Sequence, residues 1–190
     1  MTMPTMGIWH TIGQNEWEPQ RTNNFEIVFP NLGQLYSIDT RLAMPGNASE
    51  ILTLSVKSVS YPSTNIDKLT ISYGNNSINF AGRPEYSDVT IVVNDFIGIQ
   101  TERILMGWSK LVYNPKNETI GWATQYKRDG YLIEYSPDGT VARRTQLRGC
   151  FPGNVEPGDF SNDDNSLREI SVTFYVDVAI PLDGDTTIKV

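Results

Sequence analysis

Cysteine and histidine are almost absent from this chain, and their scarcity removes several classes of protein from consideration. The 190 residues contain one cysteine, Cys150, and one histidine, His10. An intramolecular disulfide needs two cysteines, so the fold cannot depend on one. A zinc site of cysteine and histidine ligands is excluded by count, and a catalytic triad or dyad that needs histidine has only His10 to draw on.

Long apolar runs and an excess of basic residues are missing as well. No run of about 18 apolar residues occurs, so the sequence predicts no membrane-spanning helix. Residues 1–20 contain neither a basic segment nor a continuous apolar one, and so do not resemble a signal peptide. With 15 basic and 22 acidic residues, the formal charge is −7, which provides no general electrostatic footprint for nucleic acid. Solubility is the simplest interpretation of this charge, and a conduit through which nucleic acid slides without binding would also suit it.

The remaining composition is that of a globular protein with one domain. Hydrophobic residues make up 39% and charged residues 19% of the chain, which is typical of a folded protein of this length. Residues 1–21 show no periodicity, and we expect an extended N-terminal arm that docks through its isolated tryptophans, Trp9 and Trp17. Residues 22–180 are predicted to form a single β domain, and residues 181–190 a C-terminal tail.

Alternation of apolar and polar residues predicts a chain built mainly from β-strands. The strongest runs are residues 25–29, 52–56, 69–73, 78–80, 89–93, 131–135, 141–150 and 170–178, with a short strand expected near 123–126. The sequence Gly-Asn-Asn at 74–76 supplies residues that tolerate a positive φ, as a hairpin turn requires. Residues 69–80 therefore indicate a long hairpin, while 82–84 and 152–164 are expected to break the strand pattern and form loops.

One segment has helical rather than alternating periodicity. Ile104, Trp108 and Leu111 recur at i, i+4 and i+7 between residues 97 and 113, which predicts one amphipathic helix with Trp108 as its anchor in the core. We therefore expect a mainly β fold, an antiparallel β-sandwich or barrel with a long hairpin and one packed α-helix.

Motifs for catalysis or cofactor binding are lacking. The chain has no Gly-x-Ser-x-Gly elbow and no glycine-rich phosphate loop. The acidic segment 159–165 fails as an EF-hand, because Asp164 stands where glycine is needed and Ile170 where glutamate is needed. A looser calcium site and a solvated loop are the alternatives for this segment. We expect no enzyme, no metal and no cofactor, with an unrecognised hydrolase as the weakest alternative.

The predicted hairpin has an apolar face that a monomer would expose. Leu69 and Ile71 on one strand, and Ile78 and Phe80 on the other, share that face. Such a surface favours aggregation unless neighbouring subunits cover it. Repeated head-to-tail contact closes into a ring, and stacked rings form a tube.

The same stretch resembles a known protein family. Tyr61-Pro62 after a strand, the amphipathic hairpin, Gly82-Arg83 and a strand that ends in Val-Asn-Asp at 93–95 are similar to the tail tube proteins of contractile-tailed bacteriophages. Trp108 in a short helix and the run GCFPGNVEPGDFSNDDNSLREISVTFYVDV, from Gly149, extend the resemblance, which covers residues 23–179.

The resemblance implies a structural virion protein that forms hexameric rings. Hairpin strands from six subunits would make one inner β-barrel, and stacked rings would form a conduit for DNA inside a contractile sheath. The implied partners are other copies of the chain, the tail sheath protein, the tape measure protein, baseplate proteins, and passing DNA without specific binding. The implied location is the virion tail, after assembly in the host cytoplasm, with no membrane partner.

On this interpretation two surfaces carry the function, the lumen wall and the subunit contacts. The Trp108 helix would pack outside the barrel, and the segments 61–65 and 152–164 would take part in ring stacking. The candidate lumen and contact residues are Lys57, Tyr61, Pro62, Lys68, Leu69, Thr70, Ile71, Ile78, Phe80, Pro152, Asn154, Thr173 and Asp177.

Three departures from the family pattern leave alternatives open. The N-terminal arm is long, the insert at 116–129 is large, and the tail at 181–190 is extra. A baseplate protein that initiates the tube and a type VI secretion-like tube protein would share the fold. A carbohydrate-binding β-sandwich is the second alternative, since nine tyrosines and four tryptophans could stack on sugars; their scatter over strands, arm and helix instead favours core and interface positions.

Overall fold

The computed structural model describes residues 19–36, 47–99, 101–160, 162 and 166–182. The predicted N-terminal arm lies outside the described residues except for 19–21, as does the predicted tail from residue 183 onward. The described strands run from Phe25 to Pro181. The domain boundaries at 21 and 181 therefore stay predictions.

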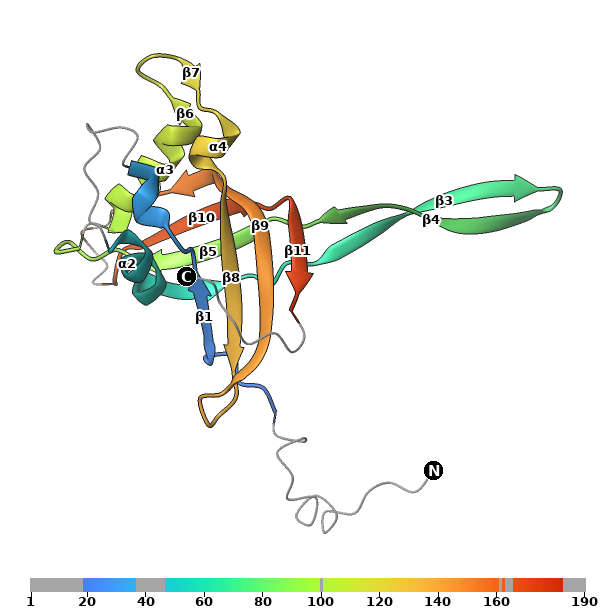
Figure 1. Ribbon diagram of the computed structural model, residues 1–190, viewed down its shortest axis with the longest axis horizontal. Coiled ribbons are helices and arrows are strands. Elements are labelled where there is room, and N and C mark those ends of the chain that lie inside the picture. The colour runs from blue at the N-terminus through green and yellow to red at the C-terminus, as the bar shows by residue number, and fades with distance from the viewer. Residues whose placement is uncertain (1–18, 37–46, 100, 161, 163–165, 183–190) are drawn as a thin grey trace, which may run out of the picture.

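Antiparallel strands dominate the fold, as the alternation predicts (Figure 1). A seven-stranded sheet has the order β1-β8-β9-β10-β5-β2, and β11 pairs with β9; β3–β4 and β6–β7 form separate two-stranded sheets. The strands are β1 (Phe25–Val28), β2 (Val56–Val59), β3 (Thr64–Tyr73), β4 (Asn76–Tyr86), β5 (Val89–Asn94), β6 (Tyr113–Asn114), β7 (Thr119–Ile120), β8 (Arg128–Tyr135), β9 (Val141–Glu156), β10 (Glu169–Tyr175) and β11 (Val178–Pro181). The helices are the 3₁₀ helix η2 (Leu32–Tyr36), α2 (Ala48–Ser55), α3 (Thr101–Val112) and α4 (Ala123–Tyr126).

The long strand β9 joins two parts of the sheet. Its first part, up to Cys150, pairs with β8, and its last part, from Phe151, pairs with β10. The strands β8 and β9 therefore cross β5 and β10 at a steep angle (Figure 1). Gly149, at the point where the pairing changes, has a φ of 67°, a conformation that favours glycine. The two parts of the sheet thus curl around a single core.

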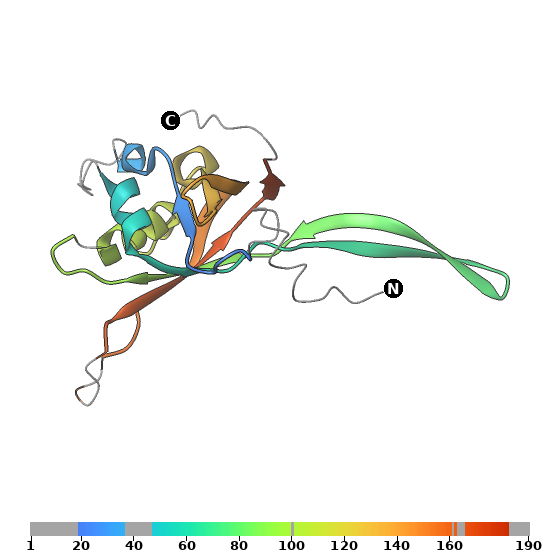
Figure 2. The ribbon, with the colours of Figure 1, turned by 90° about the horizontal axis from the view of Figure 1, so that it is seen from below.

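The predicted helix is present as α3 and closes this core. Trp108 is fully buried, and its ring lies 5.3 Å from that of Phe29 and 5.2 Å from that of Phe174. The indole Nε1 donates a hydrogen bond of 2.7 Å to the carbonyl oxygen of Tyr126. In Figure 2 the helices lie together on one side of β5 and β10. The opposite face of these strands is left without a helical layer.

The strand predicted at 52–56 is wrong in its first part. Residues 48–55 form the helix α2, whose buried residues are Ala48, Ile51, Leu52 and Ser55, at i, i+3, i+4 and i+7. Leu54 is 81% exposed. The alternation of Leu52 and Leu54 therefore did not indicate a strand. The segment instead follows the helical period, which places its buried residues on the one side of α2 that packs against the core. The short strand expected near 123–126 is also wrong, because those residues form α4.

Two predicted strand breaks do not occur. β4 continues to Tyr86, since Gly82 and Arg83 both lie opposite Asp67 and are accommodated as a bulge. β9 likewise continues through Pro152 to Glu156, with a bulge at Gly153 of β9, next to the proline, a place where proline is tolerated. Conversely, the strand predicted over 170–178 ends at Tyr175, and Val178 begins β11.

Candidate subunit contacts and lumen surface

The β3–β4 hairpin projects from the body as an arm with two different faces (Figure 1). Leu69 lies opposite Phe80, and Ile71 opposite Ile78, so these four side chains share one face of the hairpin. Each is at least 50% exposed. On the other face, Lys68, Thr70 and Ser72 lie opposite Ala81, Asn79 and Ser77. The structure therefore brings the predicted hairpin residues together as an uncovered apolar face backed by a polar one.

Backbone hydrogen bonds continue from both sheets into the short segments that connect the hairpin to the main sheet. The backbone amide of Ser60 donates to the carbonyl of Thr90 at 2.8 Å, and the amide of Ser87 to the carbonyl of Ser63 at 2.9 Å. The first bond extends the pairing of β2 with β5 by one residue, and the second extends the pairing of β3 with β4 at the base of the arm. A two-stranded hairpin is only marginally stable in water on its own. Its apolar face therefore indicates that another molecule covers it.

Tyr61 and Pro62 lie at the base of the arm and differ in accessibility. The Tyr61 side chain is 56% exposed, and its hydroxyl is 2.9 Å from the Thr145 hydroxyl, which ties the base of the arm to β9. Pro62 is buried. Little of the Pro62 ring is therefore accessible to another subunit, and its part in a subunit contact stays a prediction.

The outer face of the sheet formed by β2, β5, β10 and the end of β9 carries mainly hydroxyl and amide groups. Thr173 pairs with Thr90 on one side and Asn154 on the other, and Ser171 lies two residues along the same face. The alternate residues of β5 and β10 are buried in the core. This surface, called here the polar sheet face, unites three predicted positions: Lys57 at its β2 edge, Asn154 and Thr173.

Charges on the polar sheet face are compensated within the chain. Lys57 forms an ion pair with Glu169, and Glu156 accepts a hydrogen bond of 2.8 Å from the Asn154 amide. Because Lys57 on β2 is paired with Glu169 on β10 across β5, the face presents few uncompensated cations.

Two predicted lumen or contact residues lie elsewhere. Asp177 occupies the bend between β10 and β11, where its carboxylate accepts hydrogen bonds from Lys127 Nζ at 2.6 and 2.8 Å. It does not lie on a strand of the polar sheet face, because the strand ends at Tyr175. Pro152 is in β9 and buried, so the prediction that it lies in a loop is wrong. The role of residues 152–164 in ring stacking stays a prediction.

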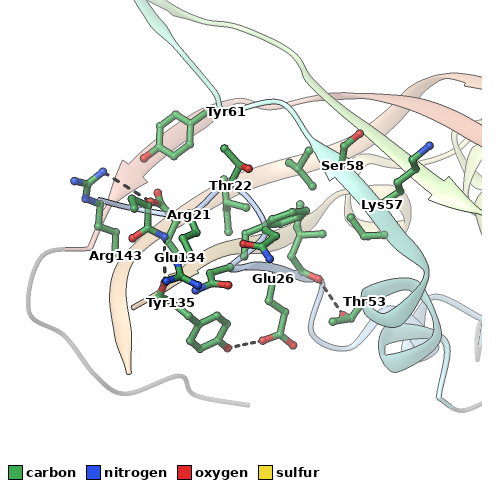
Figure 3. A pocket seen from close by; sticks show the side chains of 18 of the residues that line it. Arg21, Thr22, Glu26, Thr53, Lys57, Ser58, Tyr61, Glu134, Tyr135 and Arg143 are labelled. Atoms are coloured by element: carbon green, nitrogen blue, oxygen red, sulfur yellow. Dashed lines mark hydrogen bonds and ion pairs between the residues drawn. The ribbon is translucent and has the colours of Figure 1, made fainter. Parts of the chain in front are cut away.

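An open groove separates the two edge strands of the curled sheet. Within the described residues, β1 pairs only with β8 and β2 only with β5, and the space between these edges measures about 1150 Å³. Its lining includes Phe25, Val56, Val59 and the exposed Leu54. Figure 3 shows Lys57 and Ser58 on the β2 side of this groove and Glu26 and Tyr135 on the β1 side.

The polar rim of this groove forms its own hydrogen bonds. Tyr135 donates its hydroxyl to the Glu26 carboxylate (Figure 3). This hydrogen bond, together with burial, raises the pKa of Tyr135 to about 12. Arg143 forms an ion pair of 3.7 Å with Glu134. Sequence reasoning missed this groove, because β1 and β2 are separated by helix α2 and no local motif marks two strand edges that meet only after the sheet curls.

Catalytic and metal chemistry find no support in the described part of the chain. Cys150 is buried, and burial, the largest cause, raises the pKa of its thiol to about 12, so the reactive thiolate is scarce near neutral pH. Residues 19–36, 47–99, 101–160, 162 and 166–182 contain no group of three His, Cys, Asp or Glu placed to hold a metal ion. None of the helices described here has the length and apolarity to cross a membrane.

Comparison with known proteins identifies relatives of this architecture. The chain is 26% identical over 162 residues to tail tube protein gp19 of Enterobacteria phage T4, and equally to that of phage T6, covering 84% of this chain and 88% of each relative. No protein-family model matches the chain.

Solved structures share the fold. The sheath–tube complex of the extracellular contractile injection system PVC, in its extended state, contains a chain with a TM-score of 0.63 and 17% identity, covering 91% of this chain and 96% of that one. The cap of the anti-feeding prophage contains another, with a TM-score of 0.62 and 16% identity, covering 87% and 91%. The resemblance seen in the sequence is confirmed: the chain is homologous to phage tail tube proteins and has the fold of contractile injection tubes.

Proposed function

We propose that this chain is the tail tube subunit of a contractile-tailed bacteriophage, a structural virion protein that assembles into stacked hexameric rings. The observation that carries the proposal is the combination of an uncovered amphipathic arm with a sheet whose outer face is polar. Homology to phage tail tube proteins supports it over most of the chain. The protein acts in the virion tail, as a scaffold without catalysis or cofactor.

The polar sheet face lines the lumen in this proposal. Duplex DNA carries one negative charge per ~1.7 Å of its axis, so a wall rich in free cations would hold it in place. The wall offered here consists of residues such as Thr90, Ser171 and Thr173, with Lys57 neutralised by Glu169. DNA can therefore pass without specific binding.

Ring closure uses the free edges of the main sheet. In the described part of the chain, residues 151–156 of β9 pair only with β10, and β2 pairs only with β5. An unpaired strand edge is a template for pairing with another chain. Joining the β2 edge of one subunit to the β9 edge of the next makes a heterologous contact that closes into a ring and continues the polar wall around it.

Further partners follow from the tail in which such a tube operates. One structural neighbour comes from a sheath–tube complex and another, with a TM-score of 0.60, from the baseplate of the anti-feeding prophage. We propose a sheath protein around this tube, a baseplate at its end and a tape measure protein in its lumen. The helix layer, with α3, lies on the side of the sheet away from the polar face (Figure 2) and so faces outward.

Electron microscopy with light scattering tests the proposal. Purified protein is expected to form rings of six subunits and tubes with an axial hole. To locate the lumen, Thr173→Cys and Asn117→Cys variants are biotinylated as subunits, assembled and exposed to streptavidin. We expect labelling at position 117, on the exposed β6–β7 turn, and protection at position 173. The native Cys150 is buried and provides the unlabelled background.

The outcomes separate the alternatives. Rings that never stack identify a baseplate initiator or a secretion-type ring rather than the tube subunit. A strict monomer, both alone and when added to purified tail nuclei, overturns the tube function and makes glycan binding the next measurement. Streptavidin that reaches position 173 in finished tubes overturns the lumen assignment alone.

A further inference from the structure

The groove between the edges of β1 and β2, called here the β1–β2 groove, leaves one side of the hydrophobic core uncovered. Ile27 and Leu132, both buried, are among its lining residues. Phe25, Val56 and Val59, which pack against the core and are only partly buried, line it as well. Its volume of about 1150 Å³ lies above the ~300–1,000 Å³ of most small-molecule sites. The groove therefore suits a stretch of chain better than a small molecule.

Backbone groups along the groove also lack strand partners. Within the described residues, β1 pairs only with β8 and β2 only with β5, so each strand turns one unpaired edge toward the groove. On the β1 side, the Thr53 hydroxyl donates a hydrogen bond of 3.0 Å to the Ile27 carbonyl, which satisfies one acceptor. An unpaired strand edge is a template for another extended segment. An occupant can therefore add backbone hydrogen bonds to its apolar contacts here.

The N-terminal part of the chain joins the domain at this groove. Residues 20–24 line it, and Figure 3 shows Arg21 and Thr22 among the lining side chains. The Gln20 side-chain amide donates a hydrogen bond of 3.1 Å to the Tyr135 carbonyl, and the Asn24 carbonyl accepts one of 2.9 Å from the Tyr135 amide. These contacts fix the point to which residues 1–18, which lie outside the described residues, are attached.

The segment 1–18 has the length and composition of an occupant. Residue 9 precedes Gln20 by eleven positions, a reach of up to ~40 Å, whereas a strand as short as β2 spans only ~13 Å. Residues 5–18 contain no proline, so every backbone amide in this stretch can donate. The segment holds seven large apolar residues: Met1, Met3, Met6, Ile8, Trp9, Ile12 and Trp17. The C-terminal segment 183–190 holds only two, Ile188 and Val190, and fits less well.

The charges of segment and groove are complementary. Residues 1–18 contain no lysine or arginine, and Glu16 and Glu18 give them a formal charge of −2. The groove has more basic than acidic lining residues, namely Arg21, Lys57, Arg143, Glu26 and Glu134. Complementary charge favours this pairing over one between acidic surfaces of an acidic chain.

We propose that residues 1–18 occupy the β1–β2 groove of their own chain in the free subunit and cover the β2 edge that ring closure needs. The role of this contact in assembly rests on the proposed tube function. The segment and the β9 edge of a neighbouring subunit use the same backbone groups of β2, so each excludes the other. The segment therefore delays ring closure until a neighbouring β9 edge displaces it.

Attachment to the same chain favours the segment over a second copy. A short flexible tether gives an effective concentration in the mM range, which a free subunit in solution does not reach. If one subunit in about ten has an open β2 edge, assembly requires about a tenfold higher protein concentration. Displacement is easier at the end of a growing tube, where the subunits already in place hold a β9 edge in position.

Photo-cross-linking locates the segment in the free subunit. A benzophenone amino acid replaces Trp9, and a mixture of light and isotopically heavy copies is irradiated below the concentration at which light scattering detects assembly. We expect cross-links to residues 53–61, all within one chain. Leu54→Ser alters a groove residue that is 81% exposed and should lower their yield at least about threefold. Ile120→Ser, at a residue 78% exposed outside the groove, should not.

Tube formation tests the consequence for assembly. The double variant Trp9→Ser and Trp17→Ser removes the two largest apolar side chains of the segment. We expect it to lower the protein concentration at which tubes appear by about tenfold, because more subunits then have an open β2 edge. Trp122→Ser is the matched control, since Trp122 is 78% exposed and lies outside the segment, and it should leave that concentration unchanged.

The outcomes separate this contact from the tube function. Cross-links from position 9 that join light and heavy copies, or that miss residues 53–61, overturn the contact while the tube function stands. A double variant that needs the same or a higher concentration to form tubes overturns its role in assembly. If neither the unmodified chain nor the double variant assembles even on tail nuclei, the tube function fails, and the cross-links of the free subunit still decide whether the segment occupies the groove.

Discussion

Replacing Trp108 with phenylalanine tests whether the aromatic cluster under α3 holds the two parts of the sheet together. The change removes the hydrogen bond from the indole to the Tyr126 carbonyl, worth about 1 kcal/mol. The smaller ring removes roughly 40 Å² of buried apolar area, or about 1 kcal/mol. It also leaves a cavity of roughly 40 Å³, which costs about 1 kcal/mol more. We expect the free energy of unfolding to fall by about 3 kcal/mol, a large share of the ~5–15 kcal/mol of a typical domain.

The measurement is urea unfolding followed by far-UV circular dichroism. Both proteins are measured below the concentration at which light scattering detects assembly, so that assembly does not add to the apparent stability. Trp122→Phe is the matched control, because Trp122 is 78% exposed and its replacement should change stability by less than about 0.5 kcal/mol. The m-value should stay constant. A Trp108→Phe loss below about 1 kcal/mol, or one no larger than that of Trp122→Phe, would refute the assignment of Trp108 as the anchor.

Three further predictions follow from individual contacts. Gly149→Ala should lower the free energy of unfolding by about 1–3 kcal/mol, because φ is 67° and the new Cβ would lie 2.1 Å from an Asp177 oxygen. In the same urea titration, Gly74→Asn should be nearly neutral, because nothing lies within 4 Å of a Cβ at that turn. Cys150 should react with iodoacetamide at pH 8 only as fast as the chain unfolds, since burial raises the pKa of its thiol; rapid labelling of native protein contradicts this. The pKa of Tyr135 rises from 10.0 to about 12 on folding, so its contribution to stability is present below pH 10 and is lost as the pH rises towards 12. Tyr135→Phe should flatten this loss of stability, measured by denaturant titration at each pH. Equal slopes of stability against pH in the two proteins would contradict the assignment.

The local pattern of apolar and polar residues was sufficient to predict a strand where one of its faces lies in the core and the other does not. Burial alternates strictly along residues 89–93 and 170–175: one set of side chains is buried, and the other is half-buried except for the exposed Tyr175. The helical spacing around Trp108 was equally decisive, because three apolar residues at i, i+4 and i+7 form a single stripe. The hairpin followed from its turn residues and from the apolar residues on its two strands.

Prediction from the residue pattern failed where the same residues fit both the strand and the helix period. It also failed where a residue typical of turns lies inside a strand. Leu52, Leu54 and Val56 alternate, yet the contacts of Ala48 and Ile51 with the core made the segment a helix. Pro152 looked like a strand terminator, but β9 continues past it through a bulge at the neighbouring Gly153. Asp177 looked like part of a long strand, but the chain bends there so that β11 can pair with another part of β9.

The sequence by itself determined the strand-rich composition, the amphipathic hairpin and the Trp108 helix, because each depends on residues close together in the chain. Only the tertiary structure decided where the surfaces lie. The groove between β1 and β2 exists because the sheet curls until its two edges approach. The turn after β5 is joined to the start of α3 because Arg168, the residue before β10, reaches both Asp95 and Glu102. Such surfaces combine residues that are distant in sequence, and their positions are set by strand order and register, which no local pattern encodes.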